Sequence, residues 1–300
     1  MHADAEAAKE ALLHVVRRDP RKSGVAQSRW RLEDLIEQCK WLNLETESGM
    51  SQLLQRLGIH YKRGRDYVHS PDPFYQAKID EISALKKRLE EQQGKEILLY
   101  LDELTYYRQP SLARAYEEAG EARPHAQRSL ASNTATRVVG TLDAFSGCVL
   151  FQSGSKVGIR QLVHFYQQVR QAYQEAQRIW IVLDNWPVHF HPDVLVALEP
   201  QETRFPFSRP PNWLQTPSPA AVKRWGDWQL PIQLVLLPTY ASWCNPIEKL
   251  WRKLKQDVLH LHRLADDLKA LRLLVTEFLQ QFAAGSSELL RYVGLSKCRI

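Results

Sequence analysis

Three short apolar segments, each leading into an acidic residue, place the strongest constraint on this chain. Segment 96–103 is apolar through 97–101 and then reaches Asp102. Segment 178–185 likewise runs into Asp184, and segment 234–238 leads through a loop to a predicted helix that carries Glu248. Apolar runs of this length, bounded by polar residues, predict buried strands. We therefore expect the three acids to meet in one metal site.

The chemistry of such a site follows from its ligands. Hard cations such as Mg²⁺ prefer carboxylate oxygens, and two Mg²⁺ or Mn²⁺ ions about 3.5–4 Å apart activate the attacking oxygen and stabilise the leaving oxygen of a phosphodiester. Each acid alone has an ordinary explanation at a strand end. Together they predict a metal-dependent enzyme that cuts DNA. Glu103 alternates to the other face of its strand, so we leave it out of the site.

Charge and cysteine content narrow the class of protein. The net charge of +6 and the sequence pI of about 9.1 favour a polyanionic partner, although a basic protein without a nucleic-acid role fits these values too. The four cysteines lie far apart, which predicts reduced thiols and no structural zinc. No signal peptide is visible near Met1, and no apolar run approaches membrane length. These features predict a cytoplasmic protein without a membrane partner.

Residues 1–70 are predicted to form a small all-α DNA-binding domain. Apolar residues at helical spacing in 32–39 and 47–57 predict two short amphipathic helices, which is typical of a helix-turn-helix. The polar face of the second helix suits a DNA groove, and the basic segment after it suits phosphates. The alternative is a helical hairpin with a solvated polar face. The predicted DNA-contacting residues are Ser48, Ser51, Gln52, Gln55, Arg56, Lys62, Arg63 and Arg65.

The middle of the chain predicts a connecting helix within 71–94. Its apolar stripe includes Ile79, Ile82, Leu85 and Leu89, and the remaining face is strongly charged. We expect this helix to join the N-terminal domain to the domain that follows. Packing against a partner subunit is the alternative.

Residues 95–300 predict a mixed α/β sheet with helices on its faces. The expected strands are 96–102, 136–142, 148–152, 179–183 and 234–237, and the expected helices are 159–177, 192–198, 246–260 and 265–283. Segment 199–231 is rich in Pro and Trp, which argues against regular structure there. We interpret it as an insertion beside the active site. A surface excursion anchored by its Trp residues is the alternative.

Three sequence blocks resemble those of a known family. LDE at 101–103, VLDNWPVH at 182–189 and LPTYASWCNPIEKLWRKLK at 237–255 resemble the catalytic blocks of DDE transposases from the bacterial insertion-sequence (IS-six-thirty) branch of the mariner superfamily. The resemblance runs from about residue 29 to residue 295. It implies a ribonuclease-H-like catalytic domain whose triad is Asp102, Asp184 and Glu248, with two Mg²⁺ or Mn²⁺ ions.

The resemblance also implies an activity and its partners. These are cleavage at terminal inverted repeats and cut-and-paste insertion into TA target sites, by a homodimer on double-stranded DNA in the bacterial cytoplasm, associated with the nucleoid. The spacing from Asp184 to Glu248 is 248 − 184 = 64 residues, longer than is usual in the family, and the 199–231 insertion accounts for the excess. Relatives often carry two helix-turn-helix units. Only the second is evident here, so we expect a truncated N-terminal domain.

Residues near the triad have predicted accessory roles. Asn185 and His189 are expected to contact the scissile phosphate or water. Four basic residues of the third block are expected to contact the DNA backbone, although a solvated basic face is an equal alternative. They are Lys249, Arg252, Lys253 and Lys255. Two other functions stay open, namely a catalytically inactive or repurposed transposase-derived DNA-binding protein and a different ribonuclease-H-like nuclease.

Overall fold

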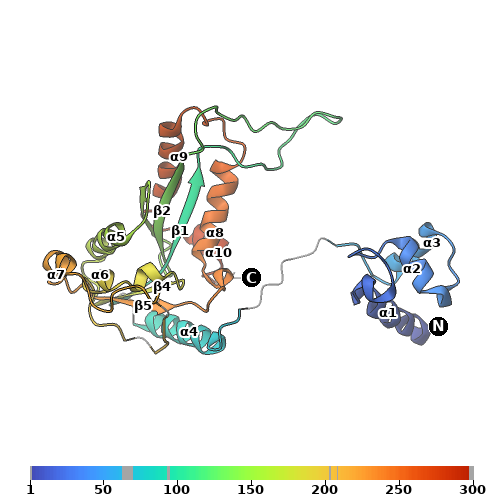
Figure 1. Ribbon diagram of the computed structural model, residues 1–300, viewed down its shortest axis with the longest axis horizontal. Helices are drawn as coiled ribbons and strands as arrows, with labels where there is room; N and C mark the ends of the chain where they lie inside the picture. The colour runs from blue at the N-terminus through green and yellow to red at the C-terminus, as the bar shows by residue number, and fades with distance from the viewer. Residues whose placement is uncertain (1, 63–69, 93–94, 203, 208, 297–300) are drawn as a thin grey trace. The chain divides into compact units, whose positions relative to one another are not determined.

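The chain divides into two compact units, Met1–Tyr67 and Val68–Ile300 (Figure 1). The computed structural model describes residues 2–62, 70–92, 95–202, 204–207 and 209–296. The predicted DNA contacts Arg63 and Arg65 therefore lie outside the described residues.

The N-terminal unit is a three-helix bundle of α1 (His2–Arg17), α2 (Leu32–Gln38) and α3 (Glu47–Arg56). Its buried core is formed by Leu12, Leu35, Cys39 and Met50. These include residues from the apolar stripes that predicted α2 and α3, so the two helices are confirmed. The Thr46 side chain caps α3 by accepting a hydrogen bond of 3.1 Å from the Gly49 N–H.

A five-stranded mixed sheet forms the centre of the second unit. Its strand order is β3-β2-β1-β4-β5. The antiparallel part contains β1 (Glu96–Tyr107), β2 (Ala135–Asp143) and β3 (Val149–Gly154), while β4 (Arg178–Leu183) and β5 (Ile232–Leu236) continue from β1 in parallel. The predicted fold class is thus confirmed.

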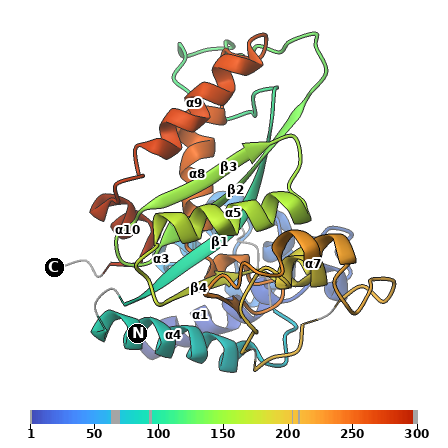
Figure 2. The ribbon, with the colours of Figure 1, turned by 90° about the vertical axis from the view of Figure 1, so that its left-hand side faces the viewer.

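Helices cover both faces of this sheet, and each face has its own core. One core involves α4 (Tyr75–Glu91), α8 (Ile247–Leu254), α9 (Leu268–Gln280) and α10 (Ser287–Val293). The other involves α5 (Ile159–Ala172), α6 (Pro192–Leu195) and α7 (Pro219–Trp225), and Figure 2 shows α5 lying across that face. Along β1, Leu98 and Tyr100 belong to the α8 face, and Leu99 and Leu101 belong to the α5 face. The same alternation assigns Asp102 to the α8 face and Glu103 to the α5 face.

Strand β1 differs from its prediction at one point that matters for the site. It continues to Tyr107 instead of ending at Asp102. The ladder with β4 stops at the Tyr100–Val182 pair, whereas the ladder with β2 continues to the Tyr107–Ala135 pair. Asp102 therefore lies inside a strand, at the point where β1 loses its parallel neighbour.

Other boundaries also differ. Helix α5 ends at Ala172, earlier than predicted, and a π-helical turn (Lys255–Leu259) follows α8. Helix α10 was not predicted. Between β1 and β2, residues 108–134 form a long loop (Figure 1).

The Pro/Trp-rich segment 199–231 is more than a surface excursion. It contains the short helix α7, and Trp225 is buried in the core on the α5 face. Phe205, Phe207 and Trp228 pack against the same core while remaining partly exposed. The prolines thus exclude long regular elements, as expected, but aromatic residues integrate the segment into the domain.

Helix α4 belongs to the core of the second unit. Ile82, Leu85 and Leu89 are buried among residues of the sheet and α8. At its start, Lys78 Nζ forms an almost fully buried ion pair of 2.8 Å with Asp72. Asp72 also accepts hydrogen bonds from the backbone N–H and side-chain Oγ1 of Thr239. This network fixes the loop that follows β5.

Within the described ranges, no helix combines the length and apolar character needed to cross a membrane.

Replacing Lys78 by Met should lower the free energy of unfolding by about 3–5 kcal/mol, because it leaves the Asp72 carboxylate buried without its cation. Urea denaturation measures the change, with Lys87→Met on the exposed side of α4 as the control. An unchanged free energy would show that the pair contributes nothing.

Stability should also depend on the protonation of Asp72. Burial raises the pKa of its carboxyl, but hydrogen bonds from Lys78, Thr239 and Phe74 outweigh that effect and lower the pKa from 3.8 to about 2. The contribution is therefore present above pH 4 and is lost as the pH falls to about 2. Acid titration of Asp72→Asn should lack this step.

Candidate active site

The carboxylate of Asp102 is held by a side chain from α8. Trp251 Nε1 donates a hydrogen bond of 3.0 Å to Asp102 Oδ2. Opposite Asp102 in the ladder lies Gly140, where an added Cβ would be 2.9 Å from the Trp251 ring. Because Trp251 is almost fully buried, the glycine provides the space that lets the indole reach the carboxylate.

Asp184 follows β4 directly and is fixed by the loop it begins. Its Oδ1 accepts a hydrogen bond of 2.9 Å from the Trp186 N–H. The next residue, Asn185, donates from Nδ2 to the Leu237 carbonyl oxygen at 2.8 Å. This bond joins the loop after β4 to the loop after β5. The side chain of Asn185 therefore has a structural partner at the edge of the site.

Glu248 lies in the first turn of α8, whose start is tied to β1. The buried Asn245 side chain donates a hydrogen bond of 2.9 Å to the carbonyl oxygen of Leu101, the residue before Asp102. Helix α8 and strand β1 are thus connected at Leu101 through Asn245 and at Asp102 through Trp251. This places the Glu248 turn next to the strand.

The three predicted acids line one cavity of about 580 Å³. Asp102 comes from the middle of the sheet, Asp184 from the end of β4 and Glu248 from α8. The rest of the wall comes from Asn185, Trp186, Asn245 and the loop 237–243. The described part of segment 199–231 contributes no residue to this lining.

The cavity brings like charges together. Burial raises the pKa of Asp102 to about 8, and the negative charges of Glu248, Glu103 and Asp184 add to this effect. A hydrogen bond from the Glu103 backbone acts in the opposite direction but is outweighed. Burial also raises the pKa of Glu248, while Lys255 and Arg252 lower it. Such a group requires a proton or a cation to offset its charge. Its all-oxygen donor set fits Mg²⁺ or Mn²⁺.

Sequence reasoning missed the contribution of Glu103. This residue does project from the face opposite Asp102, as predicted, but its Oε1 lies 3.5 Å from His189 Nε2, which in turn lies 3.8 Å from Asp184 Oδ1. Because Asp184 lies beyond the end of β4, its carboxylate is near groups of both faces. The alternation of side chains along a strand could not predict where the Asp184 carboxylate lies, because Asp184 is outside the strand.

His189 also differs from its expected role. We expected it to contact the scissile phosphate or water, but its side chain is fully buried. Its neighbours are Glu103, Asp184 and the Tyr166 hydroxyl, which is 3.2 Å from Nδ1. Tyr166 comes from α5 and belongs to the buried core on that face, so the sequence did not connect it with the site.

The basic residues of α8 and the turn after it separate into two groups. Arg252 and Lys255 are exposed and act on Glu248. Lys249 instead donates to the Val293 carbonyl oxygen at 2.8 Å, and Lys253 pairs with Asp257 at 2.8 Å. Arg252 and Lys255 are thus free of these structural contacts and lie beside the acidic cavity, where they could bind an anion.

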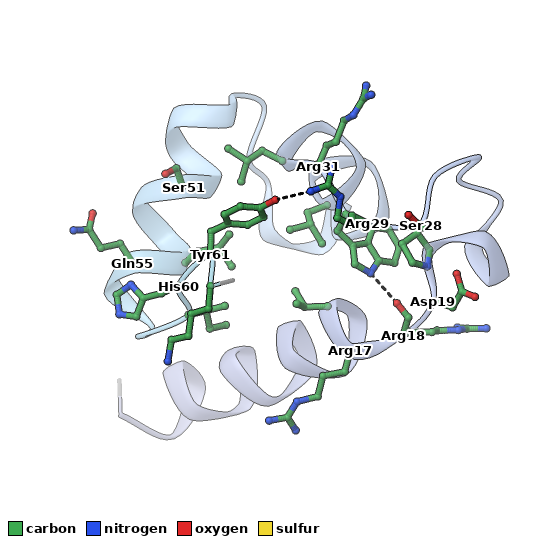
Figure 3. A pocket seen from close by; sticks show the side chains of 18 of the residues that line it. Arg17, Arg18, Asp19, Ser28, Arg29, Arg31, Ser51, Gln55, His60 and Tyr61 are labelled. Atoms are coloured by element: carbon green, nitrogen blue, oxygen red, sulfur yellow. Dashed lines mark hydrogen bonds between the residues drawn. The ribbon is translucent and has the colours of Figure 1, made fainter. Parts of the chain in front are cut away.

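The N-terminal unit contains a second hollow, of about 1360 Å³, between α1, α3 and the segment 59–62 (Figure 3). Its rim is basic. Arg29 donates a hydrogen bond of 3.2 Å to the Tyr61 hydroxyl, and Trp30 Nε1 donates to the Arg18 carbonyl oxygen at 2.9 Å. Ser51 and Gln55 of α3 also line the hollow. The predicted groove-facing residues are all exposed, namely Ser48, Ser51, Gln52, Gln55 and Arg56, as is Lys62.

Comparison with known sequences identifies a family and a relative. The family described as DDE superfamily endonuclease matches residues 82–272 of the 300. The Insertion element IS630 uncharacterized 39 kDa protein of Shigella sonnei is 22% identical over 258 residues, which cover 84% of this chain and 64% of the relative. The chain thus spans just under two thirds of the length of that relative.

Solved structures support the fold. The mariner Mos1 paired end complex with Mg superposes with a TM-score of 0.61 at 16% identity, covering 95% of this chain and 75% of that chain. The pre-cleavage Mos1 transpososome gives 0.60 at 16% identity, with coverages of 95% and 74%. The expected ribonuclease-H-like fold is therefore confirmed.

Replacing Gly140 by Ala should displace the Trp251 ring and lower the free energy of unfolding by about 1–3 kcal/mol, because the added methyl overpacks a buried contact. Gly154→Ala is the control, since its nearest neighbour would be at an ordinary 3.4 Å. Equal stabilities of the two variants in urea would contradict the role assigned to Gly140.

Replacing Asp102 by Asn should stabilise the cation-free protein. The raised pKa of Asp102 means that stability falls as the pH rises from about 4 to about 8, because the unfolded chain releases the proton first. Removing the charge should therefore add about 2–4 kcal/mol at pH 8 in EDTA. Thermal unfolding measures this, with the exposed Asp266→Asn as the control. A destabilised Asp102→Asn protein would contradict the assignment.

Proposed function

Because the chain belongs to the DDE superfamily endonuclease family, we propose that it is a transposase that cuts and rejoins DNA. The observation that carries this proposal is the cavity shared by Asp102, Asp184 and Glu248. These three residues are far apart in sequence and come from three different elements. The name of the Shigella sonnei relative, an insertion-element protein, agrees with a mobile DNA element.

The reaction proposed is cut-and-paste transposition. Asp102, Asp184 and Glu248 would hold two divalent cations, Mg²⁺ or Mn²⁺, which when bound activate the attacking oxygen and stabilise the leaving oxygen. Solved Mos1 complexes are described with Mn and with Mg. Water would first cut at the terminal inverted repeats. The freed 3′-hydroxyl would then attack target DNA at a TA site.

The chain's own residues fix the geometry of this reaction. Trp251 holds the carboxylate of Asp102, and Asn185 holds the loop after Asp184 to the loop after β5. Carboxylates held by packed neighbours in this way need little rearrangement when a cation and a phosphate arrive. The exposed Arg252 and Lys255 beside Glu248 would offset phosphate charge at the entrance.

The N-terminal unit would recognise the inverted repeats. The exposed polar face of α3 suits a DNA groove, and the basic rim of the hollow in Figure 3 suits the flanking phosphates. The Mos1 relatives are described as paired-end complexes, which supports a homodimer that holds two DNA ends. The location proposed is the bacterial cytoplasm, in association with the nucleoid.

Changing Asp102 to Asn, Asp184 to Asn or Glu248 to Gln should abolish Mg²⁺-dependent cleavage of DNA that carries the element's inverted repeats, because each removes a ligand charge. Binding of the repeats should be retained, because it belongs to the N-terminal unit. Gel assays of cleavage and binding measure both effects, with Asp257→Asn as the control.

The assay also separates the other functions. Binding without cleavage by the unmodified protein would favour an inactive, repurposed DNA-binding protein. Cleavage without joined products would favour a different ribonuclease-H-like nuclease. Cleavage retained by all three variants would sink the proposal.

A further inference from the structure

A second group of metal-ligating atoms lies on the α5 side of the sheet. It consists of one carboxylate oxygen each from Glu103 and Asp184 and one ring nitrogen from His189, all within 4.8 Å of one another. Glu103 comes from β1, Asp184 follows β4, and His189 lies in a 3₁₀ turn (Pro187–Phe190). The proposed DNA-cutting site uses neither His189 Nε2 nor Glu103 as a cation ligand.

Two of the three polar atoms of this group lack hydrogen-bond partners, whereas Asp184 Oδ1 accepts from the Trp186 N–H. His189 Nε2 and Glu103 Oε1 are both buried without one. Their separation of 3.5 Å, and the 3.8 Å from His189 Nε2 to Asp184 Oδ1, exceed the length of a good hydrogen bond. Two ligands of one first-row cation lie roughly 3–3.5 Å apart, given bonds of about 2.1 Å. The 3.5 Å separation falls within this range and the 3.8 Å separation lies slightly above it, so a small inward shift would let the three atoms share a cation.

The ring of His189 is held as metal-binding imidazoles usually are. Its second nitrogen, Nδ1, lies 3.2 Å from the hydroxyl of Tyr166. Tyr166 is itself fully buried. A metal-ligating histidine commonly makes such a bond from its other nitrogen, which fixes the ring and its tautomer.

We propose that Glu103, Asp184 and His189 form a divalent-cation position of their own, which shares Asp184 with the Asp102–Glu248 side of the site. Its role in catalysis rests on the proposed function, but its occupancy does not. The imidazole donor distinguishes this position from the all-oxygen cavity. A nitrogen ligand favours Mn²⁺ and other first-row transition metals over Mg²⁺.

Electron spin echo spectroscopy of the full-length protein with Mn²⁺, without DNA, tests this directly. The bound ion should show nitrogen modulation from the His189 ring. His189→Gln should lose that modulation, whereas His164→Gln, a partly exposed histidine on α5, should retain it. A bound Mn²⁺ ion without nitrogen modulation in the unmodified protein would overturn the proposal, whatever the variants do.

Mn²⁺ titration calorimetry gives a second readout. Tyr166→Phe keeps all three ligands but removes the bond to Nδ1, so nitrogen modulation should remain while the dissociation constant rises about 10–100-fold. Glu103→Gln should weaken Mn²⁺ binding as well, with a far smaller effect on Mg²⁺. Unchanged Mn²⁺ affinity in both variants would overturn the proposal.

The two proposals fail separately. Nitrogen modulation in a protein that cuts no DNA would leave the cation position in place and remove the transposase function. DNA cleavage by a protein whose Mn²⁺ has only oxygen ligands would support the transposase function and overturn the proposed cation position.

Discussion

Burial of like-charged carboxylates against one another is the constraint on which the second unit depends. Asp102 lies inside a strand, partly shielded from solvent, with Glu248 on the helix beside it and Asp184 at the neighbouring strand end. Repulsion in a partly buried cavity works against this arrangement. The Trp251 bond to Asp102 and the Asn245 bond to Leu101 hold α8 against β1 despite it. Packing energy thus maintains a site that a cation would stabilise.

The sheet explains how distant residues reach this place. Strand β1 has parallel and antiparallel neighbours, and the parallel ladder ends two residues before Asp102. The edge created there gives room to Asp184 and to the loops after β4 and β5. The buried Lys78–Asp72 pair then fixes the second loop through Thr239. The cavity therefore depends on where β4 and β5 end beside β1, as well as on the acidic residues that line it.

The main features of this arrangement could be predicted from the sequence, because apolar runs and apolar stripes at helical spacing indicate directly which residues are buried. The three acids of the site were predicted from three such runs, and the sheet class from the order of the expected strands and helices. The roles of Glu103 and His189 did not, because they depend on where the Asp184 carboxylate lies between two faces, which only tertiary packing sets. The aromatic residues of 199–231 were ambiguous for the same reason, since composition excludes regular elements without showing which side chains enter a core.

Anomalous scattering from a crystal of the protein soaked in Mn²⁺ tests the central claim most directly, because it locates the cation rather than its effects. The account predicts a peak in the cavity bounded by Asp102, Asp184 and Glu248, at coordination distance from their carboxylate oxygens. Full-strength peaks elsewhere, with none between these three side chains, would contradict it.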